Sequence, residues 1–223
     1  MKILSVPLAR CMWLMDFQKI NPRGRSFLDA FHALAKRYRF AKFPAHVLDF
    51  ADGGGLKFLS GAFRKGDIDL RVGLTVFDNG FQADTLSSTD DAEAFLDDIR
   101  QWLASDFNMP IDDEAIIRKS FQSQLDVQFS KELILVNPNI GSLVNKISSQ
   151  VISIDGKQHP FFIGGISLFP EAAGDTGVPW PFKLERKWGG KPFAENIYFT
   201  QAQLRTSEHI DILEEIEKAC SRD

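Results

Sequence analysis

The period of the hydrophobic positions changes several times along the chain, and each period predicts a different element. Residues 68–76 alternate strictly between apolar and polar side chains, which predicts a strand with one buried face. Similar alternation at residues 121–129 predicts another strand, and the apolar residues 1–15 predict an opening one. The Asp-Asn-Gly sequence at residues 78–80 tolerates positive φ, so we expect a type I′ hairpin and a returning antiparallel strand there.

Helical periods separate these strands. Residues 88–107 carry an apolar stripe at a spacing of three and four, with acidic residues in the first turn, which predicts an amphipathic helix. Asn137 as the cap and Pro138 at the first position predict a short helix with the apolar stripe Ile140, Leu143, Val144 and Ile147. The remaining two helices are expected over residues 27–38 and 206–220.

The second half of the chain predicts more strands. Residues 151–154 and 161–169 flank a turn and suggest a hairpin, with a close backbone approach at Gly164 and Gly165. Further strands are expected at residues 182–188 and 197–200. The fold class is therefore α+β, an antiparallel meander with about four amphipathic helices packed mainly on one side. We find no repeat and no flexible linker, so residues 1–223 predict a single domain, with a sub-boundary near residue 110 as the alternative.

Composition bounds the class of protein. The 223 residues are 44% hydrophobic and 25% charged, which excludes global disorder and allows a core of useful size. Cys11 and Cys220 form neither a disulfide framework nor a zinc-ligand spacing, and a reducing cytoplasm suits them. Residues 1–15 lack the features of a secretory signal, and residues 161–170 are about half the length of a membrane-spanning helix. We expect a soluble cytoplasmic protein without membrane insertion.

Charge is separated along the chain. Residues 16–43 contain seven basic and two acidic side chains, a net charge of +5, whereas residues 83–114 contain ten acidic side chains and one arginine, a net charge of −9. The whole chain carries −4. Opposed charge blocks on one small protein favour association with a charged partner or with another copy.

One short pattern points to catalysis. Gly54 and Gly55 are followed, after eleven residues, by Asp67-Ile68-Asp69. This arrangement resembles the signature of the nucleotidyltransferase superfamily, in which a small turn precedes an Asp-x-Asp strand and a third carboxylate lies on a later strand. The resemblance implies that Asp67, Asp69 and Asp126 hold Mg²⁺ or Mn²⁺ for transfer on a nucleotide, because aspartates two apart on a strand point the same way. The other interpretation is that Asp67 and Asp69 are simply the wet positions of a half-buried strand.

A third function class is nucleic-acid binding. The basic stretch at residues 19–42 is interleaved with aromatic rings, and cations with exposed rings would bind phosphates and stack on bases. The rings follow helical spacing, however, which favours a buried face and a solvated basic face. Cys11 lies in an apolar segment and is expected to be a buried thiol, although a Cys-His nucleophile stays open.

Protein–protein association is the function that the sequence favours. A loop rich in Gly and Pro carries Trp180 and Trp188, which are rigid anchors of the kind enriched at interface centres. We therefore predict a non-catalytic binding or assembly protein, with a homo-oligomer or another protein as the partner. The predicted partner-binding residues are Trp180, Trp188, Lys36, Arg37 and Arg39.

Overall fold

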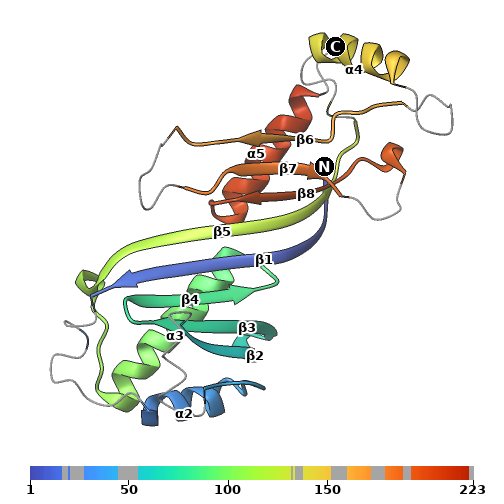
Figure 1. Ribbon diagram of the computed structural model, residues 1–223. Helices are drawn as coiled ribbons and strands as arrows, with labels where there is room; N and C mark the ends of the chain where they lie inside the picture. Colours follow the sequence, from blue (N-terminus) through green and yellow to red (C-terminus); the bar gives the residue numbers. More distant parts are fainter. Residues whose placement is uncertain are drawn as a thin grey trace. The chain divides into compact units, whose positions relative to one another are not determined.

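The computed structural model describes residues 1–16, 20, 28–44, 55–131, 133, 138–151, 160–171, 179–187 and 192–220. Within this part of the chain, four α-helices accompany an antiparallel sheet of eight strands (Figure 1). The predicted α+β class with an antiparallel sheet is confirmed. The chain forms two compact units, and strands β1 (Lys2–Met15) and β5 (Ile116–Gln128) contribute residues to both.

The first unit, called the N-terminal unit below, comprises residues 6–123 and 204–206. Its strands lie in the order β2-β3-β4-β1-β5. The face that carries Cys11 and Leu74 is buried under the apolar sides of two helices. The further elements are β2 (Leu56–Lys65), β3 (Ile68–Phe77), β4 (Gly80–Thr85), α2 (Leu28–Arg37), α3 (Thr89–Phe107) and the 3₁₀ turn η2 (Asp113–Ala115).

Helix α3 forms as its sequence predicts. Ser88 is the N-cap, and its side chain accepts a hydrogen bond from the backbone N–H of Asp91, so one of the unpaired donors of the first turn is satisfied. Asn108 ends the helix in the left-handed conformation. Every position of the predicted apolar stripe is buried, namely Ala92, Phe95, Leu96, Ile99, Trp102 and Leu103.

The β3–β4 hairpin is confirmed, but its predicted turn type is wrong. Phe77 lies opposite Gly80, so Asp78 and Asn79 alone connect the strands. Neither has positive φ, because the described non-glycine residues with positive φ are Arg39, Ser60, Asn108 and Asn196. Gly80 serves packing instead, since a Cβ there would collide with the backbone oxygen of Trp13 on the neighbouring strand.

The second unit, the C-terminal unit, comprises residues 1–5, 124–203 and 207–223. Its strands lie in the order β1-β5-β8-β7-β6, so β6 is an edge strand. The further elements are α4 (Pro138–Gln150), β6 (Gly165–Leu168), β7 (Phe182–Arg186), the 3₁₀ turn η4 (Phe193–Glu195), β8 (Ile197–Ala202) and α5 (Thr206–Ala219).

Part of the predicted hairpin in this unit lies outside the described residues, because these omit 152–159. Strand β6 pairs with β7 and covers only the end of the predicted strand 161–169. The close approach expected at Gly165 is confirmed, since a Cβ there would collide with the backbone oxygen of Leu184 on β7. At Gly164 the space is open.

The two halves of the chain repeat one topology, which the sequence did not reveal. The order β1-α2-β2-β3-β4-α3 at residues 2–107, the first repeat, returns as β5-α4-β6-β7-β8-α5 at residues 116–219, the second repeat. In both repeats the first strand neighbours the fourth, followed by the third and then the second at the edge. The expectation that the chain has no repeat is therefore wrong at the level of structure.

Hydrogen bonds and burial align the repeats residue by residue. Strands β4 and β8 have six residues each and the same order of buried and half-buried positions. Three residues follow each strand before helices that begin at Thr89 and Thr206, 117 residues apart. The N–H of Met15 donates to the oxygen of Asn79 at 2.8 Å, and the N–H of Phe129 donates to the oxygen of Asn196 at 3.0 Å. These bonds make Met15 and Phe129 equivalent.

Candidate functional site

The two aspartates of the catalytic pattern lie at the hairpin that joins β2 to β3. Lys65 lies opposite Ile68, so Asp67 belongs to the turn and Asp69 to the strand, where it faces Arg64. Both carboxylates are exposed. Gly54 lies outside the described residues, and Gly55, at φ +70°, leads into a strand.

Asp126 is instead buried on β5 in the C-terminal unit. One carboxylate oxygen accepts hydrogen bonds from the Ser5 hydroxyl at 2.6 Å and from Lys187 Nζ, also at 2.6 Å. The other oxygen is buried without a hydrogen-bond partner. The charge of Asp126 is thus balanced by a lysine, as a buried carboxylate requires.

The three aspartates do not form one group. Asp67 and Asp69 belong to the N-terminal unit and Asp126 to the C-terminal unit. In the described ranges no cluster of three His, Cys, Asp or Glu side chains could hold a metal ion. The Mg²⁺ or Mn²⁺ interpretation therefore gains no support from the geometry.

Of the three predicted basic residues, Lys36 and Arg37 end α2 and Arg39 follows the helix in the left-handed conformation. Lys36 and Arg39 point to solvent, whereas Arg37 pairs with Asp98 at 3.2 Å and lies over the Trp102 ring. The Tyr38 ring in this segment is buried in the core, so it cannot stack on a nucleic-acid base. The Asp98 carboxylate also accepts a hydrogen bond from the Tyr38 hydroxyl at 2.5 Å.

The acidic block at residues 83–114 is largely neutralised inside the N-terminal unit. Six of its ten acidic side chains form ion pairs, with Arg10, Arg37, Lys65, Arg100, Lys119 and Arg205. Burial alone would raise the pKa of Glu93, but hydrogen bonds from Lys119 and Arg205 lower the pKa below its usual value. Charge on this block is therefore less available to a partner than the sequence suggests.

Exposed apolar side chains concentrate on the C-terminal unit. Trp180 is 55% exposed, and its backbone N–H donates to the Gln203 side chain at 2.9 Å. Trp188 lies outside the described residues. Of the eighteen large apolar side chains that are exposed in the described residues, nine lie between positions 140 and 180: Ile140, Leu143, Ile147, Val151, Phe161, Phe162, Leu168, Phe169 and Trp180.

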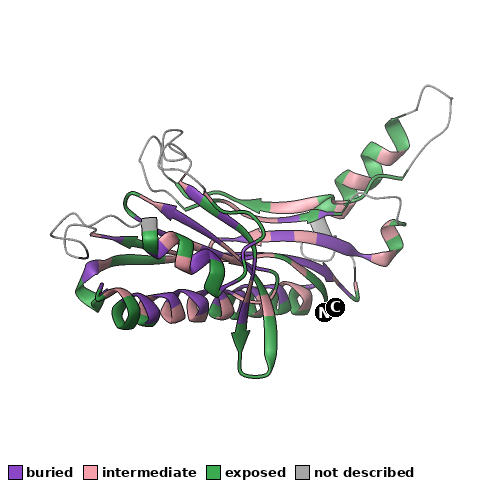
Figure 2. Cartoon of the chain, turned by 90° about the horizontal axis from the view of Figure 1, so that it is seen from below, coloured by how far each residue is buried: buried purple, intermediate pink, exposed green. Residues whose placement is uncertain are grey.

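Helix α4 contributes a large share of this surface. Its stripe is apolar as the sequence predicts, but Leu143 is 59% exposed, and Ile140 and Ile147 are exposed as well. In Figure 2, α4 projects away from the sheet, and residues 140–150, whose exposure the structure describes, are half-buried or exposed. The periodicity predicts the helix correctly, yet it does not say whether a partner surface lies against the stripe.

Phe161, Phe162, Leu168 and Phe169 are surface residues that sequence reasoning assigned to a strand. The apolar pairs Phe161-Phe162 and Leu168-Phe169 were a usable signal, because adjacent residues of a strand point to opposite faces. In such a strand one member of each pair would face away from the core of a sheet that is covered on one side. In the structure only Leu168 of the four lies in β6, and all four are exposed. Phe169 is 72% exposed.

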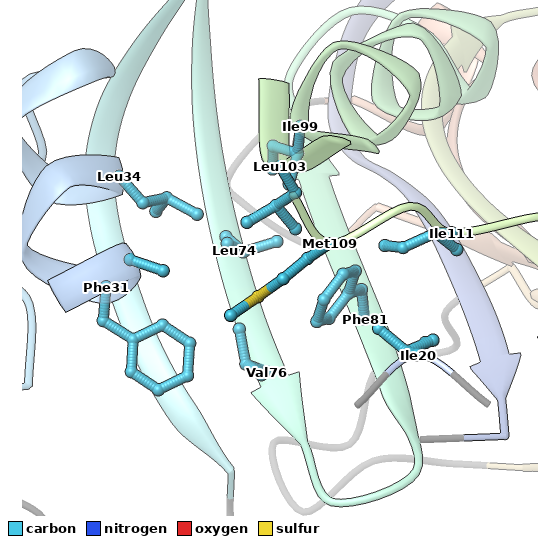
Figure 3. A pocket seen from close by; sticks show the side chains of 11 residues that line it. Ile20, Phe31, Leu34, Leu74, Val76, Phe81, Ile99, Leu103, Met109 and Ile111 are labelled. Atoms are coloured by element: carbon cyan, nitrogen blue, oxygen red, sulfur yellow. The ribbon is translucent and has the colours of Figure 1, made fainter. Parts of the chain in front are cut away.

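The N-terminal unit contains a small apolar cavity. Figure 3 shows the Met109 side chain crossing it, with Val76 and Phe31 close by. The cavity measures about 20 Å³, and all eleven residues that line it are apolar. A drug-sized ligand needs roughly 300 Å³ or more and a few polar groups, so this cavity is a packing gap.

Two potentially reactive side chains are buried. Cys11 is fully buried on β1, and burial raises the pKa of its thiol to about 12. His209 of α5 is also fully buried, and burial lowers its pKa to about 4. The Thr200 hydroxyl lies 2.8 Å from its Nε2. At neutral pH Cys11 is therefore a thiol and His209 is uncharged, which suits structural roles.

Comparison with known proteins does not assign the chain to a family. No protein-family model matches the chain, and no curated protein sequence matches it. In the described residues, none of the helices has the length and apolar character needed to cross a membrane.

Proposed function

We propose that this protein is a non-catalytic binding and assembly protein, which associates with a protein partner, either another copy of itself or a different protein, through the C-terminal unit. The observation that carries the proposal is the concentration of exposed apolar side chains between residues 140 and 180. Exposed apolar side chains are costly in water, and a part of a protein that is rich in them is a candidate interaction site. Trp180 supplies an anchor of the type that dominates interface energetics. The cytoplasm suits such a protein, because Cys11 and Cys220 are free thiols.

The composition of α4 supports the same function. Its thirteen residues include Gly141, and Lys146 is its one charged side chain. Isolated helices of this length are marginal in water even for favourable sequences, and Gly lowers helix stability by about 1 kcal/mol relative to Ala. A helix of this kind gains stability by burying its apolar stripe against another surface.

Apolar contacts carry the proposed interface more than charge does. Arg37 is held by Asp98, and six acidic side chains of the block at 83–114 are paired internally. Lys36 and Arg39 are exposed and can act at a rim. Rim charges affect the rate and specificity of association more than its free energy.

Quantitative affinity capture from an extract of the native host tests the proposal. Phe169→Ser and Trp180→Ala should each reduce the recovery of associated protein, including untagged copies of this chain, by about tenfold, since anchors at interface centres contribute more than 1 kcal/mol. Ile68→Ser is the matched control, because Ile68 is 64% exposed but lies in the N-terminal unit. Equal recovery with all three variants, or no associated protein at all, would contradict the proposal.

A further inference from the structure

The first repeat shows how its helix docks beside its neighbour. The Tyr38 ring packs edge-on against Phe95 of α3, with 4.9 Å between the ring centroids. Arg37 pairs with Asp98 of α3 at 3.2 Å. The Phe31 ring lies 5.9 Å from that of Phe58 on β2. Helix α2 therefore uses apolar contacts to α3 and β2, with one ion pair at the side.

Helix α4 carries apolar side chains at the same spacing, and a basic side chain beside them, although the residue types differ from those of the first repeat. Aligning the two apolar stripes by their spacing matches Phe31, Leu34, Ala35 and Tyr38 of the first repeat with Ile140, Leu143, Val144 and Ile147. In this alignment Arg37 corresponds to Lys146. The stripe of α4 and its lysine thus match the docking surface of α2, and the stripe is exposed or half-buried.

The surface of α3 on which α2 docks has a counterpart on α5 in the second repeat. With Thr89 equivalent to Thr206, Phe95 corresponds to Ile212 and Asp98 to Glu215. Phe95 is fully buried in the first repeat, whereas Ile212 is 37% exposed and Glu215 is exposed.

The neighbouring strands extend this surface. Leu168 lies opposite Phe182, so both side chains point to the same face of the sheet. That face carries α5, because the Phe182 ring packs against His209. Leu168 is 60% exposed and Phe182 is half-buried. The receiving surface therefore consists of Leu168, Phe182, Ile212 and Glu215.

Helix α4 does not lie on this surface in its own chain. Figure 1 shows it beyond β6, and Figure 2 shows it well apart from α5. The backbone N–H of Phe161 donates to the Ser148 hydroxyl at 2.8 Å, a contact that holds the following segment to α4. Nine residues, 129–137, precede α4 and fourteen, 151–164, follow it, whereas the corresponding connections of α2 have twelve and eighteen residues. Shorter connections favour exchange of an element between copies.

We propose that two copies of this chain exchange α4 reciprocally, each laying its helix on the Leu168, Phe182 and Ile212 surface of the other. Lys146 of one copy then pairs with Glu215 of the other, as Arg37 pairs with Asp98 in the first repeat. The contact is isologous, since each copy contributes both surfaces. This inference rests on the proposed function and names a second copy of the chain as the partner for α4, which is one part of the exposed apolar surface of the C-terminal unit.

Light scattering coupled to size exclusion of the purified full chain tests the inference. We expect a dimer, twice the chain mass of 25.1 kDa. Leu143→Glu on α4 and Ile212→Glu on α5 should each raise the dimer Kd at least about tenfold, because each places a charge in a buried apolar contact. Ile68→Glu, an exposed residue of the other unit, should leave the Kd unchanged. Circular dichroism establishes that each variant is folded.

Charge reversal provides a test that does not disturb the apolar contacts. Glu215→Lys should weaken the dimer, and Lys146→Glu together with Glu215→Lys should restore it. Lys36→Glu with Glu215→Lys is the control, because Lys36 has no role in the contact, and it should not restore the dimer. Failure of the double reversal to restore association would overturn the assigned pairing.

Mixing two variants separates exchange from other forms of association. The Leu143→Glu variant has an α4 that cannot dock but an intact receiving surface, and the Ile212→Glu variant has the reverse. A mixture should therefore form a heterodimer in which α4 of the Ile212→Glu copy docks on the Leu143→Glu copy. A purified protein that stays monomeric at about 100 μM would overturn the exchange. If the host capture then still depended on Phe169 and Trp180, the proposed function would stand with a different partner. A dimer insensitive to every variant in the C-terminal unit would overturn both.

Discussion

Thr89 and Thr206 hold the first residues of α3 and α5 together through a reciprocal pair of hydrogen bonds. The backbone N–H of Thr89 donates to the Thr206 hydroxyl at 3.0 Å, and the backbone N–H of Thr206 donates to the Thr89 hydroxyl at 2.9 Å. Both residues are buried. The N–H groups of a first helical turn have no partner within the helix, so each threonine satisfies a donor of the other helix. Equivalent positions of the two repeats thus form a matched contact.

Replacing either threonine by valine should destabilise the protein by similar amounts. Thr89→Val leaves the Thr206 N–H without an acceptor, and Thr206→Val does the same to the Thr89 N–H. Each loss should cost about 1–2 kcal/mol of the free energy of unfolding in urea, the range for a lost cap or a buried unpaired donor. Thr89→Ser keeps the hydroxyl and should recover most of the loss. A neutral result for one valine variant and a large one for the other would contradict reciprocity.

His209 should make stability fall as the solution is acidified. Burial lowers its pKa from 6.5 to about 4, so between these values the unfolded chain binds a proton that the folded chain does not. The unfolding free energy should therefore decrease as pH falls from about 6.5 to about 4, by about 3 kcal/mol from this group.

The measurement compares urea unfolding at several pH values in this window. His209→Gln should flatten the slope relative to the native chain, because the variant lacks the group that takes up a proton on unfolding. Carboxylates that titrate in the same range contribute equally to the slope of both proteins, so the difference between the two slopes reports on His209. An unchanged slope in His209→Gln would show that this histidine is protonated in the folded protein.

Local patterns were enough to predict elements but not their long-range relationships. The cap at Ser88 and the stripe of α3 are signals within one element, so they predicted α3 correctly. The repeat was hidden because its spacing is not constant: Asp78 and Asn79 connect β3 to β4, whereas residues 187–196 connect β7 to β8. Corresponding residues therefore lie at different separations along the chain, although Phe95-Leu96-Asp97-Asp98-Ile99 and Ile212-Leu213-Glu214-Glu215-Ile216 share one pattern.

The candidate site was predicted only in part for the same reason. Lys187, which balances Asp126, is 61 residues away, and no local pattern marks the pair. Alternation cannot distinguish a carboxylate paired inside a protein from one that awaits a metal ion. The hydrophobic period in the sequence of α4 predicts its apolar stripe. Where such a helix docks is shown only by α2, which occupies the same place in the order of the first repeat.

Filling the cavity of the N-terminal unit should stabilise it. Val76 lines the cavity of about 20 Å³, which is roughly the size of a methyl group, so Val76→Ile should add up to about 0.8 kcal/mol. Val72, on the same face of β3, is buried but does not line the cavity. Val72→Ile should cost about 1–3 kcal/mol by overpacking. Thermal unfolding of both variants compares the two positions, and a loss of stability in Val76→Ile would show that the cavity walls cannot accept the added group.

Both cysteines should resist alkylation until the chain unfolds. Burial raises the pKa of Cys11 to about 12 and also raises that of Cys220, and only the thiolate reacts. At pH 8 the thiolate fraction of Cys11 is about a thousandfold below that of an ordinary cysteine, before restricted access slows the reaction further. Mass spectrometry after iodoacetamide treatment should find no label on the native chain and two labels in denaturant. Rapid labelling of native Cys11 would instead indicate an activated thiol and reopen a catalytic role for β1.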